Sequence, residues 1–391
     1  MSTEQAVYLD YNATTPCDPA VVAAMLPYFA EIYGNPANGF HLLGRAANRA
    51  VEEARERVAA LINARAEEVM FTAGATESNN LAILGLARAA SGSDRRRVVT
   101  SAIEHKAVLL PCQELQREGF EVVVLPAEAN GLISVVAAQE AIDHQTLLVS
   151  IQAANNEIGT LQPVLEIAQF AHQHGAIVHC DAAQAVGKVP VDVQELDVDM
   201  LSLSAHKFYG PKGIGALFVR QGAGMLGLKP LAFGGGQERN LRPGTLNVPA
   251  IVGLGLAAQL CQKLLAQEAE QIRQKRDKLE GFLQANIPAL VINGQHVPRL
   301  PNTSSLVFPG VEADVLLLNI PELMLGTGSA CTSGAIEPSH VLQAIGLDRS
   351  DASATVRLSL GRFTTEMDIS RAGQLVLQAW QRFSTILNSS Q

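Results

Sequence analysis

The sequence predicts an α/β fold: a large domain on a mostly parallel, seven-stranded sheet flanked by helices, and a smaller α+β domain towards the C-terminus. Strand-like apolar runs alternate with helix-like amphipathic runs from residue 68 to residue 219, which is the pattern of a doubly wound parallel sheet. The 391 residues are too many for one ordinary hydrophobic core. The alternation stops near Gly234, and a long helical stretch, 249–285, is expected to bridge to the second domain.

The N-terminal residues are expected to form a short strand, 6–9, and two helices, 19–33 and 42–63. Asp18 suits the N-cap of the first helix, and Pro19 suits its first turn, where a missing N–H costs nothing. Apolar side chains recur along one face of the second helix, which makes it amphipathic.

The sheet and its covering helices follow. The expected strands are 68–72, 98–101, 121–125, 147–153, 177–180, 198–204 and 214–219. The expected helices are 77–90, 107–118, 135–141 and 164–174. Because ligands of such sheets bind at the carboxyl ends of the strands, polar residues just after each strand are the candidates for a site.

The C-terminal domain should complete the fold. Its expected strands lie near 303–308 and 354–359, and its helices near 313–319, 338–345 and 369–388. We place the large domain at residues 16–260, and the small domain at residues 1–15 together with 261–391.

The composition is that of a globular protein, with 48% hydrophobic and 17% charged residues. The net charge of −9 argues against general binding to nucleic acid or to an anionic membrane, although a local basic patch could still bind a phosphate. No run of 18 or more apolar residues is present, so no transmembrane helix is expected. The N-terminus does not resemble a signal peptide, and we therefore expect a cytoplasmic protein.

Lys207 lies where the apolar strand 198–204 opens into a Gly/Pro turn, 210–213. Burying a lysine is costly, so this placement is unusual for packing alone. A desolvated lysine has a lowered pKa and becomes nucleophilic, which suits Schiff-base chemistry. We hypothesise that Lys207 binds pyridoxal 5′-phosphate (PLP). The alternative is a surface lysine at a strand end.

Asp181 ends the apolar strand that begins at residue 177, and Gln184 lies one turn further on. A carboxylate at the end of a core strand is costly without a partner. PLP would be such a partner, because its pyridine nitrogen must stay protonated for the ring to act as an electron sink. The alternative is an N-cap for a helix at 182–186.

The stretch Gly74–Ser78 connects a strand to a helix. Small residues let the backbone approach an anion, and a helix N-terminus supplies free N–H groups. Ala75 and Thr76 could therefore cradle a phosphate. The alternative is an ordinary helix start capped by Thr76 or Ser78.

Further polar residues follow strands at the same edge of the sheet. His105 could stack on a flat cofactor and exchange protons near neutral pH, or could be an ordinary hydrogen-bonded histidine. Asn156 follows the strand 147–153, and Ser204 and His206 could bind a phosphate.

Two residues near the C-terminus also have a chemical setting. Arg357 lies in an apolar strand, where its guanidinium could bind a carboxylate in a bidentate manner or form a buried salt bridge. Cys331 lies in the Gly/Ser/Thr-rich loop 326–334, which suits an exposed and movable nucleophile, although an incidental loop cysteine is the alternative. The five cysteines are widely spaced and form neither a disulfide framework nor a zinc motif.

Taken together, these motifs resemble the cysteine desulfurases, the NifS/IscS-type branch of the class V aminotransferase family, which has the PLP-dependent fold type I. Eight stretches in order along nearly the whole chain carry the resemblance: 9–16, 74–78, 155–159, 181–184, 204–207 with 210–215, 234–245, 328–333 and 357–365. The long loop around Cys331 is similar to group I of these enzymes. The Arg-x-Gly-His-His-Cys motif common in the second group is absent.

The resemblance implies a role for each candidate residue. Lys207 would hold PLP as a Schiff base, Asp181 would pair with the pyridine nitrogen, Gln184 would bond the phenolic oxygen, and His105 would stack on the ring. The phosphate would be held by Ala75, Thr76, Ser204, His206 and, from the neighbouring subunit of a homodimer, Thr245. The substrate carboxylate would be held by Arg357 and by Asn156, which would also line the cofactor site, with Asn35 as a weaker candidate.

The implied activity is a cysteine desulfurase. Lys207 would also remove the Cα proton of L-cysteine, and the thiolate of Cys331 would accept its sulfur. The products would be L-alanine and a persulfide on Cys331, which would pass sulfur to acceptors such as a scaffold for iron–sulfur assembly. Cys331 could also contribute a ligand to a transient iron–sulfur cluster in a complex, although one cysteine cannot form such a site alone.

Two other functions remain open from the residues. One is a related lyase acting on selenocysteine or cystine, for which Cys331 would be dispensable. The other is a catalytically idle PLP-fold protein that acts as a sulfur-relay partner or regulator. The joint presence of Lys207, Asp181 and His105 disfavours the second.

The sequence departs from the family pattern in two places. Family members commonly have Gly-Asn-Pro-Ser-Ser, whereas this chain has Gly-Asn-Pro-Ala-Asn at 34–38, which weakens the assignment of Asn35. The last expected helix is followed closely by Gln391, so the longer C-terminal tail with which housekeeping desulfurases dock their scaffold is expected to be absent.

Overall fold

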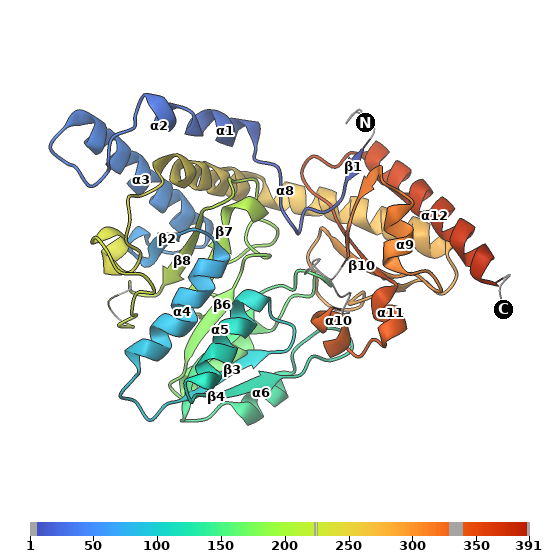
Figure 1. Cartoon of the computed structure of the whole chain (residues 1–391), viewed down its shortest axis with the longest axis horizontal. Helices are drawn as coiled ribbons and strands as arrows, with labels where there is room; N and C mark the ends of the chain where they lie inside the picture. The colour runs from blue at the N-terminus through green and yellow to red at the C-terminus, as the bar shows by residue number, and fades with distance from the viewer. Residues whose placement is uncertain (1–5, 223, 225, 328–338, 389–391) are drawn as a thin grey trace.

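The computed structural model describes residues 6–222, 224, 226–327 and 339–388, and Figure 1 shows their arrangement. A seven-stranded sheet has the strand order β2-β8-β7-β6-β5-β3-β4. Its strands are β2 (Val69–Thr72), β3 (Arg97–Ser101), β4 (Glu121–Leu125), β5 (Thr146–Gln152), β6 (Ile177–Asp181), β7 (Met200–Ser204) and β8 (Gly215–Val219). Strand β8 runs antiparallel to both of its neighbours, β2 and β7, and the other neighbouring strands of this sheet pair in parallel, which confirms the predicted, mostly parallel, doubly wound sheet.

Helices cover both faces of this sheet. They are α1 (Pro19–Met25), α2 (Pro27–Ala30), α3 (Leu42–Leu61), α4 (Ala75–Ala89), α5 (Lys106–Arg117), α6 (Val135–Ala141), α7 (Val164–Gln173) and the start of α8 (Val248–Asn286). Successive strand residues point to opposite faces, and on β2 Met70 packs with α4 and α5 while Phe71 packs with the core under α3, α7 and α8. Because both faces are buried, the central strands consist almost entirely of buried residues.

The helix predicted at 19–33 is interrupted. The structure has α1 and α2 instead, with Leu26 between them and Pro27 at the start of α2. Proline has no backbone N–H to donate to the preceding turn, and its ring clashes with the carbonyl four residues earlier, so a helix does not continue smoothly through it. The predicted cap is confirmed, since the carboxylate of Asp18 accepts the N–H of Ala20 at 2.9 Å.

The 39-residue helix α8 joins the two parts of the molecule, as Figure 1 shows. Part of α8 is apolar enough, by length and composition alone, to cross a membrane. However, 56% of that stretch is buried inside the protein, and its first half packs against α3 and α1. We therefore interpret it as an interior helix, whose apolar residues are explained by the protein's own core.

The C-terminal part forms a second core around the other half of α8. A four-stranded sheet has the order β12-β13-β10-β9, and a separate pair joins β1 and β11. These strands are β1 (Val7–Tyr8), β9 (Val291–Ile292), β10 (Thr303–Val307), β11 (Leu323–Met324), β12 (Gly326–Thr327) and β13 (Thr355–Ser359). The helices α9 (Ala313–Leu318) and α12 (Glu366–Asn388) pack in this second core, whereas α10 (His340–Ala344) and α11 (Arg349–Ser353) bury their apolar side chains in the core of the large sheet.

The N-terminal residues thus belong structurally with this second core. Val7 and Leu9 are buried among its side chains, and Asp10 makes an isolated bridge to Ser359 of β13. The chain then crosses back to the large sheet, where Thr15 N–H donates to the carbonyl of His206 at 2.9 Å. Residues 10–15 therefore connect the two cores beside Lys207.

Candidate active site

A cavity of about 860 Å³ opens at the carboxyl ends of the sheet strands. The register aligns these ends closely, since Asp181 of β6 pairs with Gln152 of β5 and Ser202 of β7. Most of the residues predicted from the sequence line this cavity: Ala75, Thr76, His105, Asn156, Asp181, Gln184, Ser204, His206 and Lys207. The structure therefore brings into one cavity side chains that are far apart in the sequence, the most distant being Ala75 and Lys207, which are 132 positions apart (207 minus 75).

The turn that follows β2 is suited to binding an anion. Helix α4 starts at Ala75, two residues earlier than predicted, and its N-cap is Gly74, which offers no side-chain cap. The alternative that Thr76 or Ser78 caps this helix is therefore wrong. The first N–H groups of α4 have no intrahelical partner and face the cavity with the positive end of the helix dipole. Gly74 has φ +150°, and a Cβ there would lie 3.5 Å from Oγ of Ser204.

Lys207 lies in a short 3-10 turn, Ala205–Lys207, directly after β7. Its Nζ donates to two backbone carbonyls, Asn12 O at 2.6 Å and Ala13 O at 3.0 Å. Burial, assisted by the positive charge of Arg357, lowers the pKa of Lys207 to about 8, against opposing effects of nearby carboxylates. The amine is therefore held in place and is partly unprotonated near neutral pH.

Asp181 is held from both sides. Its Oδ2 accepts the side-chain N–H of Asn79 at 2.7 Å, and its Oδ1 accepts the backbone N–H of Ala183 at 3.0 Å. No helix follows at 182–186, where the chain forms a turn, so the alternative of a helix N-cap is wrong although Asp181 does bond the backbone of that turn. An ionised carboxylate has about four acceptor positions, so Asp181 can still accept an N–H from a ligand in the cavity.

Asn79 was missed by the sequence reasoning. It lies on α4, is completely buried and lines the cavity. Its neighbours at helical spacing, Ile83 and Leu86, belong to the apolar core. A buried asparagine on an apolar helix face is the signal that could have revealed it, because such a group needs a specific partner.

Both histidines of the cavity are held in fixed orientations. His105 is the N-cap of α5, and its Nδ1 accepts the N–H of Ala107 at 3.1 Å, which leaves Nε2 to carry the ring proton. Burial lowers the pKa of His105, and the Lys207 charge acts in the same direction. Burial, with Lys207 and Lys212, lowers the pKa of His206 to about 4. Both rings are therefore neutral at neutral pH.

Arg357 of β13 lies beside the cavity, not on its lining. Its Nη2 pairs with Oδ1 of Asp10 at 2.6 Å, and its Nη1 donates to the backbone carbonyl of Asn156 at 3.1 Å. The predicted alternative of a buried salt bridge is therefore present. Its Nε is buried without a hydrogen-bond partner among the described residues, so the N–H at this nitrogen remains unused.

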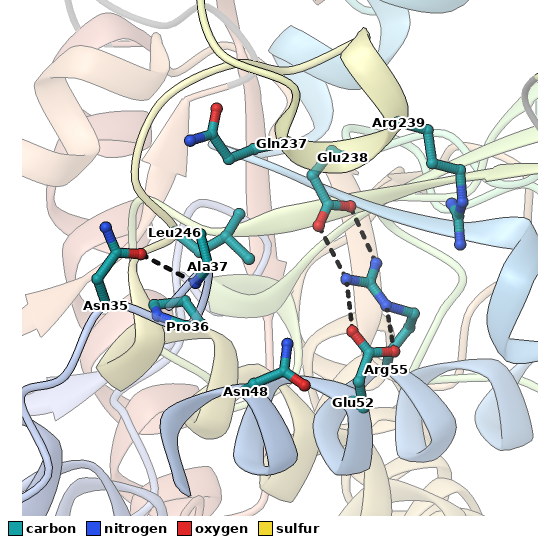
Figure 2. Close-up of a pocket in the computed structure, with 10 residues that line it drawn as sticks. All are labelled: Asn35, Pro36, Ala37, Asn48, Glu52, Arg55, Gln237, Glu238, Arg239 and Leu246. Carbon is teal, nitrogen blue, oxygen red and sulfur yellow. Dashed lines mark hydrogen bonds and ion pairs between the residues drawn. The ribbon is translucent and has the colours of Figure 1, made fainter. Parts of the chain in front are cut away.

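Asn35 and Thr245 are not brought to this cavity within one chain. Asn35 lines a separate cavity of about 280 Å³, shown in Figure 2, and its Oδ1 accepts the N–H of Ala37 at 3.0 Å. Leu246 lines the same cavity, and Thr245 beside it is exposed. Cys331 lies outside the described residues.

The loop on the rim of that second cavity is firmly anchored. Buried Arg55 of α3 pairs with buried Glu238 at 2.8 Å, as Figure 2 shows, and Glu238 also accepts the N–H of Phe71 on β2 at 2.8 Å. Residues Glu238, Arg239 and Asn240 all have positive φ, which is costly for residues with side chains. The ion pair therefore holds a strained loop against the strand that leads into the Gly74 turn.

Comparison with known proteins identifies the family. The family model for aminotransferase class-V matches residues 7–372.

This chain belongs to the class-V aminotransferase family.

Curated relatives of this chain carry the name cysteine desulfurase, and solved structures resemble it closely. "Cysteine desulfurase IscS" of Rickettsia bellii (strain OSU 85-389) is 45% identical over 370 residues, which cover 95% of this chain and 90% of the relative. A solved structure named "NIFS-LIKE PROTEIN" has TM-score 0.88 and 36% identity, covering 97% of this chain and 100% of that one. The structure "SspA in complex with cysteine" has TM-score 0.81 and 40% identity, covering 92% and 100%.

Class-V aminotransferases use PLP, which makes PLP the cofactor of this chain. The residues of the large cavity fit it. The free N-terminus of α4 suits a phosphate, Asp181 suits a protonated ring nitrogen, and the amine of Lys207 suits the aldehyde. Gly74 has φ +150°, a backbone conformation that favours glycine, and this lets the chain turn sharply from β2 into the N-terminus of α4.

Proposed function

We propose that this protein is a cysteine desulfurase, which converts L-cysteine to L-alanine and transfers the sulfur to Cys331 as a persulfide. The observation that carries the proposal is that Lys207 and Asp181 line the same cavity at the carboxyl edge of the sheet, where the pKa of Lys207 is lowered to about 8. The desulfurase names of the relatives and the cysteine complex of a structural neighbour support the choice of substrate.

Bound PLP supplies an electron sink for the electron pair left at the substrate Cα when its proton is removed. Asp181, oriented by Asn79 and by the Ala183 N–H, holds the ring nitrogen in its protonated form. The amine of Lys207 anchors the cofactor and, once released, takes the Cα proton at Nζ. The carbonyls of Asn12 and Ala13 hold Nζ in position when it is not bound to the cofactor.

Cys331 then acts as the sulfur acceptor. Its thiolate attacks the sulfur of the substrate, a sulfur–sulfur bond forms, and the carbon–sulfur bond breaks. The electron pair of the broken bond stays on the substrate carbon, which takes up a proton and becomes the methyl group of L-alanine. No external oxidant or reductant is required, and the sulfur remains as a persulfide that a second thiol can remove.

The substrate carboxylate binds to Arg357 and Asn156 in this proposal. The unused Nε of Arg357 and the bond from its Nη1 to the Asn156 carbonyl support it, because they place a guanidinium donor next to the cavity. Binding would require the carboxylate to compete with Asp10 for the guanidinium.

We also propose a homodimer in which Thr245 contacts the phosphate in the partner subunit's cavity, and Asn35 serves the partner's substrate. Neither residue lines the Lys207 cavity of its own chain. Asn35 lines the cavity of Figure 2, and Thr245 directly precedes Leu246, which lines it too. From within the same chain, the phosphate is held by Ala75, Thr76, Ser204 and His206. Gln184 bonds the phenolic oxygen, and His105 stacks on the ring.

We also propose a division of the chain into two domains, together with a set of partners and a location. The division into a large domain (16–260) and a small domain (1–15 with 261–391) is supported by the separate core around α12, β10 and β13. The proposed sulfur acceptors are proteins such as an iron–sulfur scaffold, in whose complex Cys331 could serve as a transient cluster ligand. The proposed location is the cytoplasm.

Two variants test the activity. The protein with PLP should have a visible Schiff-base absorption band that Lys207→Ala abolishes, and absence of the band in the unaltered protein would contradict the proposal. Cys331→Ala should keep the band but release neither alanine nor sulfide from L-cysteine. Full retained turnover would instead indicate a related lyase acting on selenocysteine or cystine.

A further inference from the structure

Lys188 is a lysine buried in the protein interior, only 9% exposed, in the turn that follows β6. Among the residues that the structure describes, no carboxylate lies within salt-bridge distance of its Nζ. Burial lowers the pKa of Lys188 well below its usual value, and the neighbouring charges of Lys207 and Arg357 lower it further. A buried lysine without an acidic partner is costly, so its amine needs other hydrogen-bond partners.

The amine of Lys188 binds two side-chain amides. Its Nζ donates to Oδ1 of Asn12 at 2.9 Å and, through a short hydrogen bond, to Oε1 of Gln184. Gln184 lines the large cavity, whereas Lys188 lies behind it. Among the described residues, the hydrogen bonds of the Lys188 amine therefore reach the site through Asn12 and Gln184.

The hydrogen bonds of Gln184 determine which of its atoms faces the cavity. Its Oε1 accepts from Lys188, and its Nε2 donates one proton to the Asn12 carbonyl at 2.9 Å. An amide nitrogen has two protons, so one N–H is left to donate to a ligand. Without Lys188, the amide could rotate by half a turn and present its oxygen, which cannot donate.

Asn12 is the second residue that Lys188 fixes. Its Oδ1 also accepts from Asn302 at 3.0 Å, and its Nδ2 donates to Oγ1 of Thr303 at 2.8 Å, so it joins the large sheet to the C-terminal core. The backbone carbonyl of the same residue accepts the amine of Lys207 at 2.6 Å. Lys188 therefore braces the segment that holds the Lys207 amine.

We propose that Lys188 is a positioning residue of the PLP site, which holds the Gln184 amide with its N–H towards the phenolic oxygen of the cofactor and braces Asn12 behind Lys207. This role rests on the proposed function. A hydrogen bond donated to the phenolic oxygen draws negative charge away from it. The adjacent protonated Schiff base then loses its proton at a lower pH than it would without that hydrogen bond.

The test is a spectroscopic titration of the holoenzyme. In Lys188→Met, which keeps the length but removes the donors, the pH midpoint of the cofactor absorption band should rise by about 1 unit. Gln184→Leu should raise it at least as far, and the double variant should shift no further than Gln184→Leu alone. The PLP dissociation constant and the thermal midpoint of the cofactor-free protein are measured on the same variants.

Two controls separate positioning from a merely structural role. Lys263→Met removes an exposed lysine of α8 and should leave the midpoint unchanged. Lys188→Arg keeps a donor and should restore the midpoint towards that of the unaltered protein. If Lys188→Met does not fold, Lys188→Gln, with a shorter reach, should give a smaller shift in the same direction.

A normal Lys207-dependent band with an unchanged midpoint in Lys188→Met overturns the role of Lys188 alone. Additive shifts in the double variant overturn it as well. Absence of any Lys207-dependent band in the unaltered protein overturns the proposed function itself, and the two failures are therefore distinguishable.

Discussion

Asn79 of α4 donates its side-chain N–H to Oδ2 of Asp181 at 2.7 Å, and both side chains are buried. The bond links the helix whose N-terminus faces the cavity to the carboxylate at the end of β6. It holds one carboxylate oxygen, while the Ala183 N–H holds the other. In the proposed function, the orientation of Asp181 towards the ring nitrogen of PLP therefore depends on Asn79, a residue that takes no part in the reaction itself.

Removing this amide should weaken cofactor binding. A hydrogen bond to a charged group contributes about 1.5–3 kcal/mol, so Asn79→Ala should raise the PLP dissociation constant by about tenfold or more. Titration of the cofactor-free protein followed by absorbance measures it. Asn286→Ala, which removes an exposed amide that bonds the Phe282 carbonyl on α8, is the matched control and should bind PLP normally. Equal affinities for the Asn79 variant and the control would contradict the assignment.

The lowered pKa of Lys207 predicts how cofactor loading depends on pH. Only the unprotonated amine attacks the aldehyde, so the rate of Schiff-base formation should rise with pH and level off above a midpoint near 8. Arg357→Leu removes a positive charge that lowers this pKa and leaves Asp10 unpaired beside it, so the midpoint should move to higher pH. Mixing cofactor-free protein with PLP at about pH 6 to 10 measures both curves. The control Arg349→Leu, at an exposed site, should not move the midpoint. A downward shift for Arg357→Leu would refute the claim that the charge of Arg357 lowers the pKa of Lys207.

The close packing of β8 against the turn at Gly74, the proposed phosphate site, predicts an effect on stability. A Cβ on Gly215 of β8 would lie 2.7 Å from Cα of Gly74 and even closer to the carbonyl of Leu203. Gly215→Ala should therefore lower the free energy of unfolding by about 1–3 kcal/mol and displace the turn, which weakens PLP binding. By contrast, Gly281→Ala on α8 meets open space and should stabilise the protein by about 0.5–1 kcal/mol. Chemical denaturation of the cofactor-free variants measures both, and equal stabilities would contradict this packing.

The proposed sharing of sites between subunits predicts complementation. Two variants, Lys207→Ala and Thr245→Glu, should each be nearly inactive as homodimers, because one lacks the amine and the other repels the phosphate. In a heterodimer isolated with two affinity tags, one cavity carries both changes and the other carries neither. Such a heterodimer should have about half the activity of the unaltered dimer. An inactive heterodimer would instead place Thr245 in the cavity of its own chain.

The carboxyl-edge residues could be predicted because their signals are local. Each follows an apolar strand in a strand–helix alternation, and a polar residue at such a point lies at the ligand-binding edge wherever the strand falls in the order. Lys207, Asp181 and His105 were found in this way. Strand bounds within the large sheet were also close, since buried parallel strands are continuous apolar runs.

Partners far apart along the chain could not be predicted in the same way. Arg357 pairs with Asp10 across 347 positions, and Arg55 pairs with Glu238 across 183. The first pair depends on how the N-terminal segment crosses between the two cores, and the second depends on how the loop at Glu238 folds back onto α3 and β2. No local sequence pattern exists for either. The strands β9, β11 and β12 are two residues long, too short to show alternation.

Two features that the sequence analysis did not predict were nevertheless indicated by residues in the sequence. Pro27 within the predicted helix 19–33 marked the interruption between α1 and α2. Lys188 was also visible as a lysine between apolar neighbours, although its partners Asn12 and Gln184 follow only from the folded chain.

The central claim is that sulfur passes from the substrate to Cys331. The most direct measurement is mass spectrometry of the peptide that contains Cys331, after the PLP-loaded protein has been incubated with L-cysteine and trapped with an alkylating agent. The account predicts one added sulfur on Cys331, formed together with L-alanine and absent in Lys207→Ala. Alanine release with an unmodified Cys331, or the added sulfur on another cysteine, would contradict it.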